Sequence, residues 1–194
     1  MGLRSVCLHL FGGIKTRVAS GIREIRSIGR AGREGFVNEI EISIAKNGRA
    51  KKRRFAEKTF FDRQLSHLGK PVEKFRVIKA LAKLNREKKL GLKIVPTIRL
   101  RFVEKNDWRI ITTILPIEES VQNAILRSKI FSRSELAPTV LKKMKEFTVD
   151  MERQQSVAQM NGYLIHNSAF VPVLRKGAKK VEAVIVDIGH IVSF

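Results

Sequence analysis

Apolar and polar residues alternate strictly in one short segment of this chain, and this alternation limits the fold more than any other feature. Ile40, Ile42 and Ile44 each follow a polar residue, and the pair Asn47-Gly48 comes shortly afterwards. A two-residue period is typical of a strand with one buried face, and Asn-Gly favours the tight turn of a hairpin. The sequence therefore predicts that a sheet begins here, with a basic loop over residues 49–54 after the turn.

A second segment carries apolar residues at helical spacing. Pro71 suits the first turn of a helix, and the pattern runs to near Gly91. One face of this predicted helix is apolar and the other is rich in cations. The apolar residues are Val72, Phe75, Ile78, Leu81, Ala82 and Leu84, and the cations opposite them are Lys74, Arg76, Lys79, Lys83, Arg86 and Lys88.

In other segments of the chain, apolar residues recur either at every second position, as in a strand, or at helical spacing. A short helix is expected from Phe55 to Gly69, and two strands at 98–102 and 108–115 are expected to form a hairpin. Further elements are a helix from Ile117, a helix from Ser134 as N-cap to Gly162, and strands over 163–165, 170–174 and 181–188. This pattern predicts an α+β fold, an antiparallel sheet backed by helices.

The first 35 residues are interpreted as a basic amphipathic arm, and residues 36–194 as one α+β domain. Ile14, Val18, Ile22 and Ile25 recur at helical spacing among arginines, which predicts a basic N-terminal helical arm. Such a helix suits an anionic membrane surface or RNA, and an Arg-rich, acid-poor start is also typical of a mitochondrial transit peptide. A surface helix with solvated charges is equally consistent with the pattern, because glycines at 21, 29 and 32 weaken an isolated helix.

The charge distribution indicates a polyanionic partner. Of the formal net charge of +21, residues 1–93 carry +16 (24 Lys and Arg against 8 Asp and Glu), and the remaining 101 residues carry +5 (15 against 10). Neutralising phosphates with Lys or Arg releases counterions, so nucleic acid is the first candidate and anionic lipid the second. No apolar run reaches the roughly 18 residues needed to span a bilayer, so we expect membrane contact to be peripheral. The single cysteine, Cys7, fits a reducing compartment.

The densest cluster of cations is Lys51-Lys52-Arg53-Arg54. Phosphate backbones and nuclear import receptors both bind such a run, although a solvated loop also explains it. The cationic face of the helix at 71–91 and the lysines that follow it extend the predicted polyanion surface. This surface comprises Lys51, Lys52, Arg53, Arg54, Lys74, Lys79, Lys83, Lys88 and Lys89, and the predicted membrane or arm contacts are Arg17, Arg23 and Arg26.

Residue patterns typical of catalysis are missing from the sequence. There is no Gly-rich phosphate loop, no G-x-S-x-G elbow and no cysteine pair, and the four histidines show no metal-ligand spacing. We therefore expect no enzymatic activity, no cofactor and no metal site. The single Trp108 and single Tyr163 provide few platforms for base stacking, which favours phosphate binding without base reading.

Three segments of the C-terminal half follow one another in a distinctive order. They are the helix running into Met160-Asn161-Gly162-Tyr163-Leu164-Ile165, the basic turn after it, and Val184-Ile185-Val186-Asp187-Ile188-Gly189-His190-Ile191. These segments resemble the closing helix, strand and hairpin of the family of rhabdovirus matrix proteins. Residues 74–81 are similar to its apolar helix, and residues 98–115 fall where its central hairpin lies, so the match is collinear over about 36–194.

The resemblance implies a viral structural protein that self-associates, condenses the ribonucleoprotein and links it to an anionic membrane during budding. Its locations would be the virion, the host nucleus and the inner face of a host membrane. The family's late-budding motifs are missing, since Pro138 stands alone in Leu136-Ala137-Pro138-Thr139. With Lys51 to Arg54 as an import signal, this departure would suit a plant-infecting relative that assembles at the nuclear membrane.

Two other classes of protein are consistent with the same sequence. A ribosomal or other RNA-bound protein, which could be mitochondrial, would bind structured RNA without self-assembly. A viral movement protein or silencing suppressor would bind single strands or short duplexes. Self-association would use exposed apolar residues of the sheet or of the N-terminal segment, and the sequence does not say which.

Overall fold

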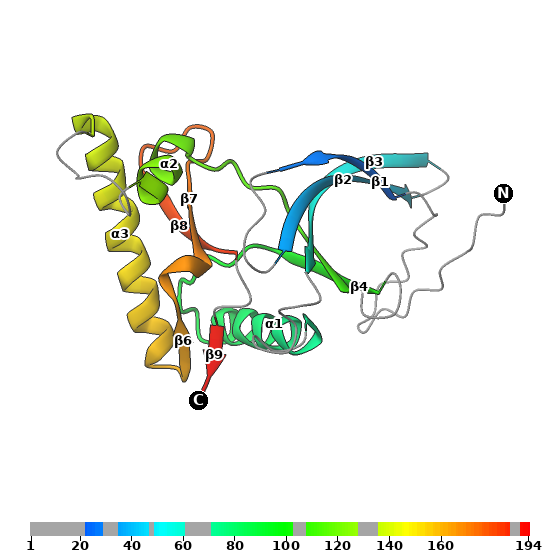
Figure 1. Cartoon of the computed structure of the whole chain (residues 1–194). Helices are drawn as coiled ribbons and strands as arrows, with labels where there is room; N and C mark the ends of the chain where they lie inside the picture. The colour runs from blue at the N-terminus through cyan, green and yellow to red at the C-terminus, as the bar shows by residue number, and fades with distance from the viewer. Residues whose placement is uncertain are drawn as a thin grey trace. The chain divides into compact units, whose positions relative to one another are not determined.

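The structure, a computed structural model, describes residues 22–28, 35–46, 49–60, 71–102, 108–127, 136–186 and 191–194. The chain forms two compact units (Figure 1). Unit 1 comprises Met1–Gln64 and Ile98–Ile114, and unit 2 comprises Leu65–Thr97 and Leu115–Phe194. Strands and helices are both present, which confirms the α+β class. The predicted division at residue 35 stays a prediction.

A five-stranded sheet contains the strands of unit 1, in the order β1-β2-β3-β5-β4. The pairs β1–β2, β2–β3 and β3–β5 are antiparallel, as the alternating pattern predicted. The strands are β1 (Ile22–Ser27), β2 (Gly35–Lys46), β3 (Arg49–Phe60), β4 (Thr97–Phe102) and β5 (Trp108–Thr112).

The β2–β3 hairpin confirms the predicted strand and turn, but the basic loop predicted after the turn is wrong. Lys46 pairs with Arg49 across the two-residue connection Asn47-Gly48, and pairing continues residue by residue to Gly35 and Phe60. A two-residue connection returns the chain in register, so the residues after the turn become the partner strand. Residues 49–54 are therefore strand, and so are residues 55–60, where a helix was expected; residues 61–69 lie outside the described part of the chain.

The predicted N-terminal helix is also wrong at Ile22–Ser27, which form strand β1. Ile22 pairs with Ile42 and Arg26 with Glu39, and the register shifts between Glu24 and Arg26. The edge of β2 offers β1 a backbone hydrogen-bond partner and an opposite charge, whereas flanking glycines disfavour a helix. Residues 14–21 of the predicted helix lie outside the described residues.

One face of the unit 1 sheet carries an apolar cluster. Ile40, Ile42, Phe55 and Ile111 lie on this face and are buried together. Ile40 is opposite Phe55 in the register, so their side chains project from the same face. At the base of the hairpin, a Cβ built on Gly35 would lie 1.9 Å from the backbone oxygen of Thr59, so only glycine fits there.

Unit 2 combines helices with two small antiparallel sheets, β6–β9 and β7–β8. The long helix α3 packs against β6 and β8, α1 lies beside β9, and α2 contacts α3 and β7 (Figure 1). The helices are α1 (Pro71–Glu87), α2 (Glu119–Arg127), α3 (Pro138–Gln159) and the short 3₁₀ helix η3 (Asn167–Ala169). The strands are β6 (Tyr163–Ile165), β7 (Phe170–Val173), β8 (Glu182–Ile185) and β9 (Ile191–Ser193).

The start of α1 agrees with the sequence prediction, whereas α2 and α3 both begin later than predicted. Helix α2 begins at Glu119 rather than at Ile117, which instead forms a bridge with Val173. Helix α1 begins at Pro71, as predicted. Helix α3 begins at Pro138 with Ala137 as its N-cap, so the prediction of Ser134 as N-cap is wrong. Proline is favoured in the first turn because its missing N–H needs no partner there, and its preset φ starts the helix. Gly162 adopts φ +81° beyond the C-terminal end of α3, as expected for a helix stop.

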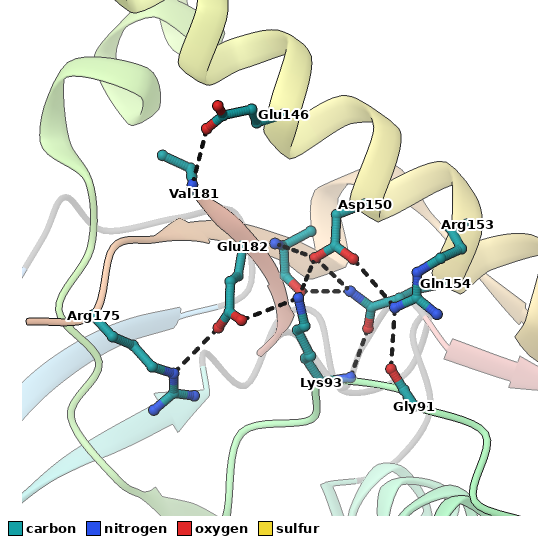
Figure 2. A network of polar contacts seen from close by, with 10 residues as sticks. Gly91, Lys93, Glu146, Asp150, Arg153, Gln154, Arg175, Val181 and Glu182 are labelled. Atoms are coloured by element: carbon teal, nitrogen blue, oxygen red, sulfur yellow. Dashed lines mark hydrogen bonds and ion pairs between the residues drawn. The ribbon is translucent and has the colours of Figure 1, made fainter. Parts of the chain in front are cut away.

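A polar network fastens α3 to β8 (Figure 2). Gln154 is fully buried; its side-chain nitrogen donates to the backbone oxygen of Ala183 at 2.7 Å, and its oxygen accepts from the backbone nitrogen of Lys93, also at 2.7 Å. Asp150 accepts from the backbone nitrogen of Ala183 at 2.9 Å and from the Lys93 ammonium at 2.9 Å. Glu182 also pairs with Lys93, at 3.2 Å. The network holds three separate segments of unit 2 together.

Burial acts most strongly on the Asp150 carboxyl and by itself would raise its pKa. The hydrogen bonds from Lys93, the backbone of Ala183 and Arg153 oppose this effect and leave the pKa below its ordinary value. Lys93 and Asp150 therefore form an internal ion pair, which serves the packing of α3.

Within the described residues, no helix has the length and apolar character required to cross a membrane.

Candidate nucleic-acid interface

The distal part of the β2–β3 hairpin is a two-stranded ribbon. Strand β1 pairs with β2 only at residues 38–42, and β5 pairs with β3 only at residues 56–59. Within the described residues, positions 43–46 and 49–52 therefore pair only with each other. The structure brings Lys51, Lys52, Arg53 and Arg54 together on this ribbon and at its root, all four exposed.

Two of these cations belong to a face of the sheet that also carries carboxylates. Lys52 lies 3.1 Å from a carboxylate oxygen of Glu41, and Arg54 lies 3.2 Å from one of Glu39. Arg26 also donates to Glu39, at 2.8 Å. The Glu39 side chain is 5% exposed, whereas the three cations are 64–70% exposed. This face therefore partly neutralises its own positive charge.

The hydrogen bond from Arg26 is the main reason that the pKa of Glu39 lies below its ordinary value; Arg54 contributes in the same direction. Of the predicted arm contacts, Arg26 is thus fixed to the sheet by Glu39. Arg23 is exposed and lies opposite Glu41 in the strand register. Arg17 lies outside the described residues.

The opposite face of the ribbon carries Lys51 and Arg53. Both project from the same side as the apolar cluster, since Arg53 pairs with Ile42 in the register and side chains alternate along a strand. Both side chains are exposed, and neither has an ion-pair or hydrogen-bond partner within the described part of the chain. These two cations are therefore available to an external anion at little cost to the fold.

Helix α1 displays the predicted cationic face only in part. Lys74 is 6% exposed, so the prediction that it faces solvent is wrong. It precedes Ile78 by four residues and Leu81 by seven, and this spacing places all three residues on the buried side of the helix.

The other cations of α1 are exposed, and two of them, Lys79 and Lys83, have local partners. Lys79 donates to the backbone oxygen of Thr97 at 2.6 Å and lies 5.3 Å from the Phe75 ring centroid. Desolvation, followed by the nearby charge of Arg86, lowers the pKa of Lys79. Lys83 lies 3.8 Å from Glu87, a long contact that solvent screens.

The two lysines after α1 are exposed. Lys88 donates to the side-chain oxygen of Asn161 at 3.2 Å. Lys89 adopts φ +51°, which is uncommon for a residue with a side chain, and it has no side-chain partner within the described residues. Lys79, Lys83, Lys88 and Lys89 form a moderately basic edge of unit 2.

A further basic cluster was not assigned as a site from the sequence. Lys176, Lys179 and Lys180 are exposed in the turn between β7 and β8. Arg175, in the same turn, is held by Glu182 at 3.2 Å. The signal was the basic run over residues 175–180, which is as visible in the sequence as residues 51–54.

Within the described residues, no group of three or more His, Cys, Asp or Glu side chains is placed to hold a metal ion. Among the described residues, the β2–β3 ribbon with its exposed cations at 51–54 is the feature with the clearest binding chemistry.

Comparison of the chain with protein-family models gives no matching family, and comparison with curated proteins gives no significant match.

Proposed function

We propose that this chain is a non-enzymatic structural protein that binds the phosphate backbone of nucleic acid through the β2–β3 ribbon. One observation carries the proposal. Residues 42–56 contain six cations and no Asp or Glu, and they form the distal part of a hairpin. Lys51 and Arg53 on that hairpin are exposed and have no partner within the described residues. A row of cations on a paired ribbon matches a row of phosphates, and releasing counterions drives the binding.

The ribbon favours phosphate contacts over base stacking. Phe55, the aromatic residue among positions 42–56, is 8% exposed and packs in the apolar cluster, so no aromatic ring is presented to a base there. Without a stacking platform, sequence-specific recognition of single strands has no basis at this site. The substrate class in this proposal is the backbone of duplex or packaged RNA, read through its charge and shape.

In its fullest form, the proposal is that the chain is a matrix-type protein, as the resemblance of residues 36–194 to rhabdovirus matrix proteins implies. Its partners would be a viral ribonucleoprotein, further copies of the chain, a nuclear import receptor and an anionic membrane bound peripherally. It would be located in the virion, the host nucleus and at a host membrane. The support for this form is the strong basic charge, the order of α3, β6, β7 and β8, and the exposed ribbon.

The test compares two double variants that change the charge equally. K51Q/R53Q and K52Q/R54Q each lower the formal net charge from +21 to +19, but only the second removes partners of Glu39 and Glu41. Binding of the full chain to a duplex RNA of about 16 base pairs is measured by fluorescence anisotropy at several salt concentrations. K51Q/R53Q is expected to reduce the slope of log K against log salt by roughly two units, since each lost phosphate contact removes about 0.9.

K52Q/R54Q is expected to reduce the slope less, because Glu41 and Glu39 already neutralise part of the charge removed. Equal reductions in both variants would show that net charge alone drives binding. An unchanged slope in K51Q/R53Q would reject the ribbon as the binding site. Adding vesicles with anionic lipid tests the matrix form: a chain that binds RNA as a monomer and ignores the vesicles is instead an RNA-bound protein of the ribosomal kind.

A further inference from the structure

The two-stranded sheet β6–β9 has one buried and one exposed apolar face. Ile165 and Ile191 are cross-strand partners on the inner face, with exposures of 2% and 6%. Leu164 and Val192 are partners on the outer face, with exposures of 56% and 58%. A strand pair of this kind leaves two branched apolar side chains in direct contact with water.

Two further apolar residues extend this outer face or lie next to it. The backbone nitrogen of Phe194 donates to the oxygen of Gly162 at 3.0 Å, which continues the ladder by one step. Alternation then places Phe194, which is 79% exposed, on the same side as Val192. Met160, just before this sheet at the C-cap of α3, is 77% exposed. We call Met160, Leu164, Val192 and Phe194 the β6–β9 face.

The segment that carries Met160 and Leu164 is uncharged. Residues 154–174 contain no Lys, Arg, Asp or Glu over 21 positions, in a chain in which 29% of residues are charged. The exposed neighbours of Leu164 on the same segment are neutral polar residues or a histidine, over positions 166–168. Lys88 reaches the rim of this region through its bond to Asn161. An exposed apolar face with a mainly polar, uncharged border is typical of a protein contact.

The charge pattern distinguishes between the classes of partner. Nucleic acid needs cations at its contact, and the segment that carries this face has none. An apolar face that enters an anionic membrane is normally flanked by several Lys or Arg, which residues 154–174 also lack. A protein surface that is itself apolar and neutral remains as the matching occupant.

We propose that the β6–β9 face is where two copies of this chain meet. Copies with a net charge of +21 repel one another over most of their surface, and this face offers a contact made through two uncharged segments, residues 154–174 and 191–194. A second copy presents the same neutral, apolar face, so a two-fold contact packs Leu164 and Val192 of one copy against those of the other. The inference supplies the self-association that the matrix form of the proposed function requires, and it rests on that function for its role.

The dependence of this contact on salt is opposite to that of RNA binding. Salt screens the repulsion between copies and leaves apolar burial intact, so association is expected to strengthen as salt rises. Phosphate binding by the ribbon weakens under the same conditions. The two activities can therefore be measured separately on one preparation.

The experiment uses sedimentation velocity on the nucleic-acid-free full chain, over a range of protein and salt concentrations. The weight-average mass of the wild type is expected to rise from 22.1 kDa toward at least twice that value as either concentration increases. L164S/V192S is expected to stay at 22.1 kDa throughout. Both side chains are more than half exposed, so the variant is expected to keep its fold, which its melting temperature checks.

The matched control is L126S/V149S, which removes two exposed apolar side chains from α2 and α3. It is expected to associate like the wild type. A wild type that stays monomeric, or an L164S/V192S protein that assembles normally, would overturn the inference. Loss of vesicle binding in L164S/V192S without any change in mass would assign the face to a membrane and also overturn it. L164S/V192S is expected to bind RNA like the wild type, because the ribbon is unchanged in this variant. A wild type that self-associates but does not bind RNA would reject the proposed function and leave this inference standing.

Discussion

The ammonium group of Lys93 lies 2.9 Å from a carboxylate oxygen of Asp150, although 57 positions separate the two residues in the sequence. The Lys93 side chain is 33% exposed and that of Asp150 is 16% exposed, so solvent screens this pair less than it screens the ion pairs of the β2–β3 hairpin. The same carboxylate also accepts from the backbone of β8. The pair therefore holds together three parts of unit 2: the segment after α1, helix α3 and strand β8.

Gln154→Leu is expected to lower the free energy of unfolding by about 2–3 kcal/mol, because it removes the partners of the buried Ala183 carbonyl and of the part-buried Lys93 backbone N–H. Gln159→Leu is the matched control on the same helix: Gln159 is exposed, and we expect a change within about 0.5 kcal/mol. Urea unfolding of the two variants measures the difference. Equal effects would contradict the structural role of Gln154.

Stability is expected to fall in acid partly through Asp150. Its pKa in the folded state is lowered, so the unfolded chain binds the proton more readily. The stabilisation is present above the ordinary pKa of about 3.9 and is lost as the pH falls through the folded value. The Tm difference between the wild type and Asp150→Asn should therefore shrink as the pH falls from about 6 to about 3. A difference that stays constant over this range would show that Asp150 does not contribute to the pH dependence.

Gly35→Ala is expected to weaken the base of the β2–β3 hairpin. The new Cβ would lie 1.9 Å from the backbone oxygen of Thr59, and the two strands must separate to relieve the clash. A cost of about 1–3 kcal/mol is expected, as for other overpacked sites. Hydrogen exchange should show lost protection at the residues around Gly35 and Phe60. Ser43→Ala in the same strand should leave both stability and protection near wild type.

Nuclear accumulation, if the import proposal holds, depends on all four cations of residues 51–54. Replacing each with Gln in a fluorescent fusion should reduce the nuclear-to-cytoplasmic ratio to that of the fluorescent protein alone, because import receptors bind consecutive exposed cations. Neutralising Lys176, Lys179 and Lys180 instead removes exposed positive charge elsewhere, and should leave the ratio unchanged. The import proposal fails if the first variant still accumulates.

Local patterns predicted most of the elements, and non-local pairing explains the errors. The Asn47-Gly48 turn, the Pro71 start of α1 and the hairpin at 97–112 all follow from signals within a few residues. Strand β3 begins with charged residues of low strand propensity, and only its partner β2 makes it a strand. Strand β1 was predicted as a helix because its strand conformation also depends on pairing with β2.

The exposure of the candidate cations was predicted better than the ion pairs around them. Lys51 to Arg54 were recognised from their charge alone, and they are exposed. Lys74 was placed on the wrong face, although its spacing from Ile78 and Leu81 already indicated burial. The pairing of Arg26 and Arg54 with Glu39 depends on a strand register that no short window of sequence contains.

The path of the chain through the two units affects how the protein is synthesised. Unit 1 is completed only by Ile98–Ile114, after the first segment of unit 2 has been made. Until β5 has left the ribosome, residues 56–59 of β3 pair with β2 on one side but lack β5 on the other. A nascent chain with an open strand edge is prone to pair with other chains. Chaperone occupancy on translating ribosomes should therefore peak between the synthesis of β3 and that of β5, and a chain cut after Gln64 should aggregate.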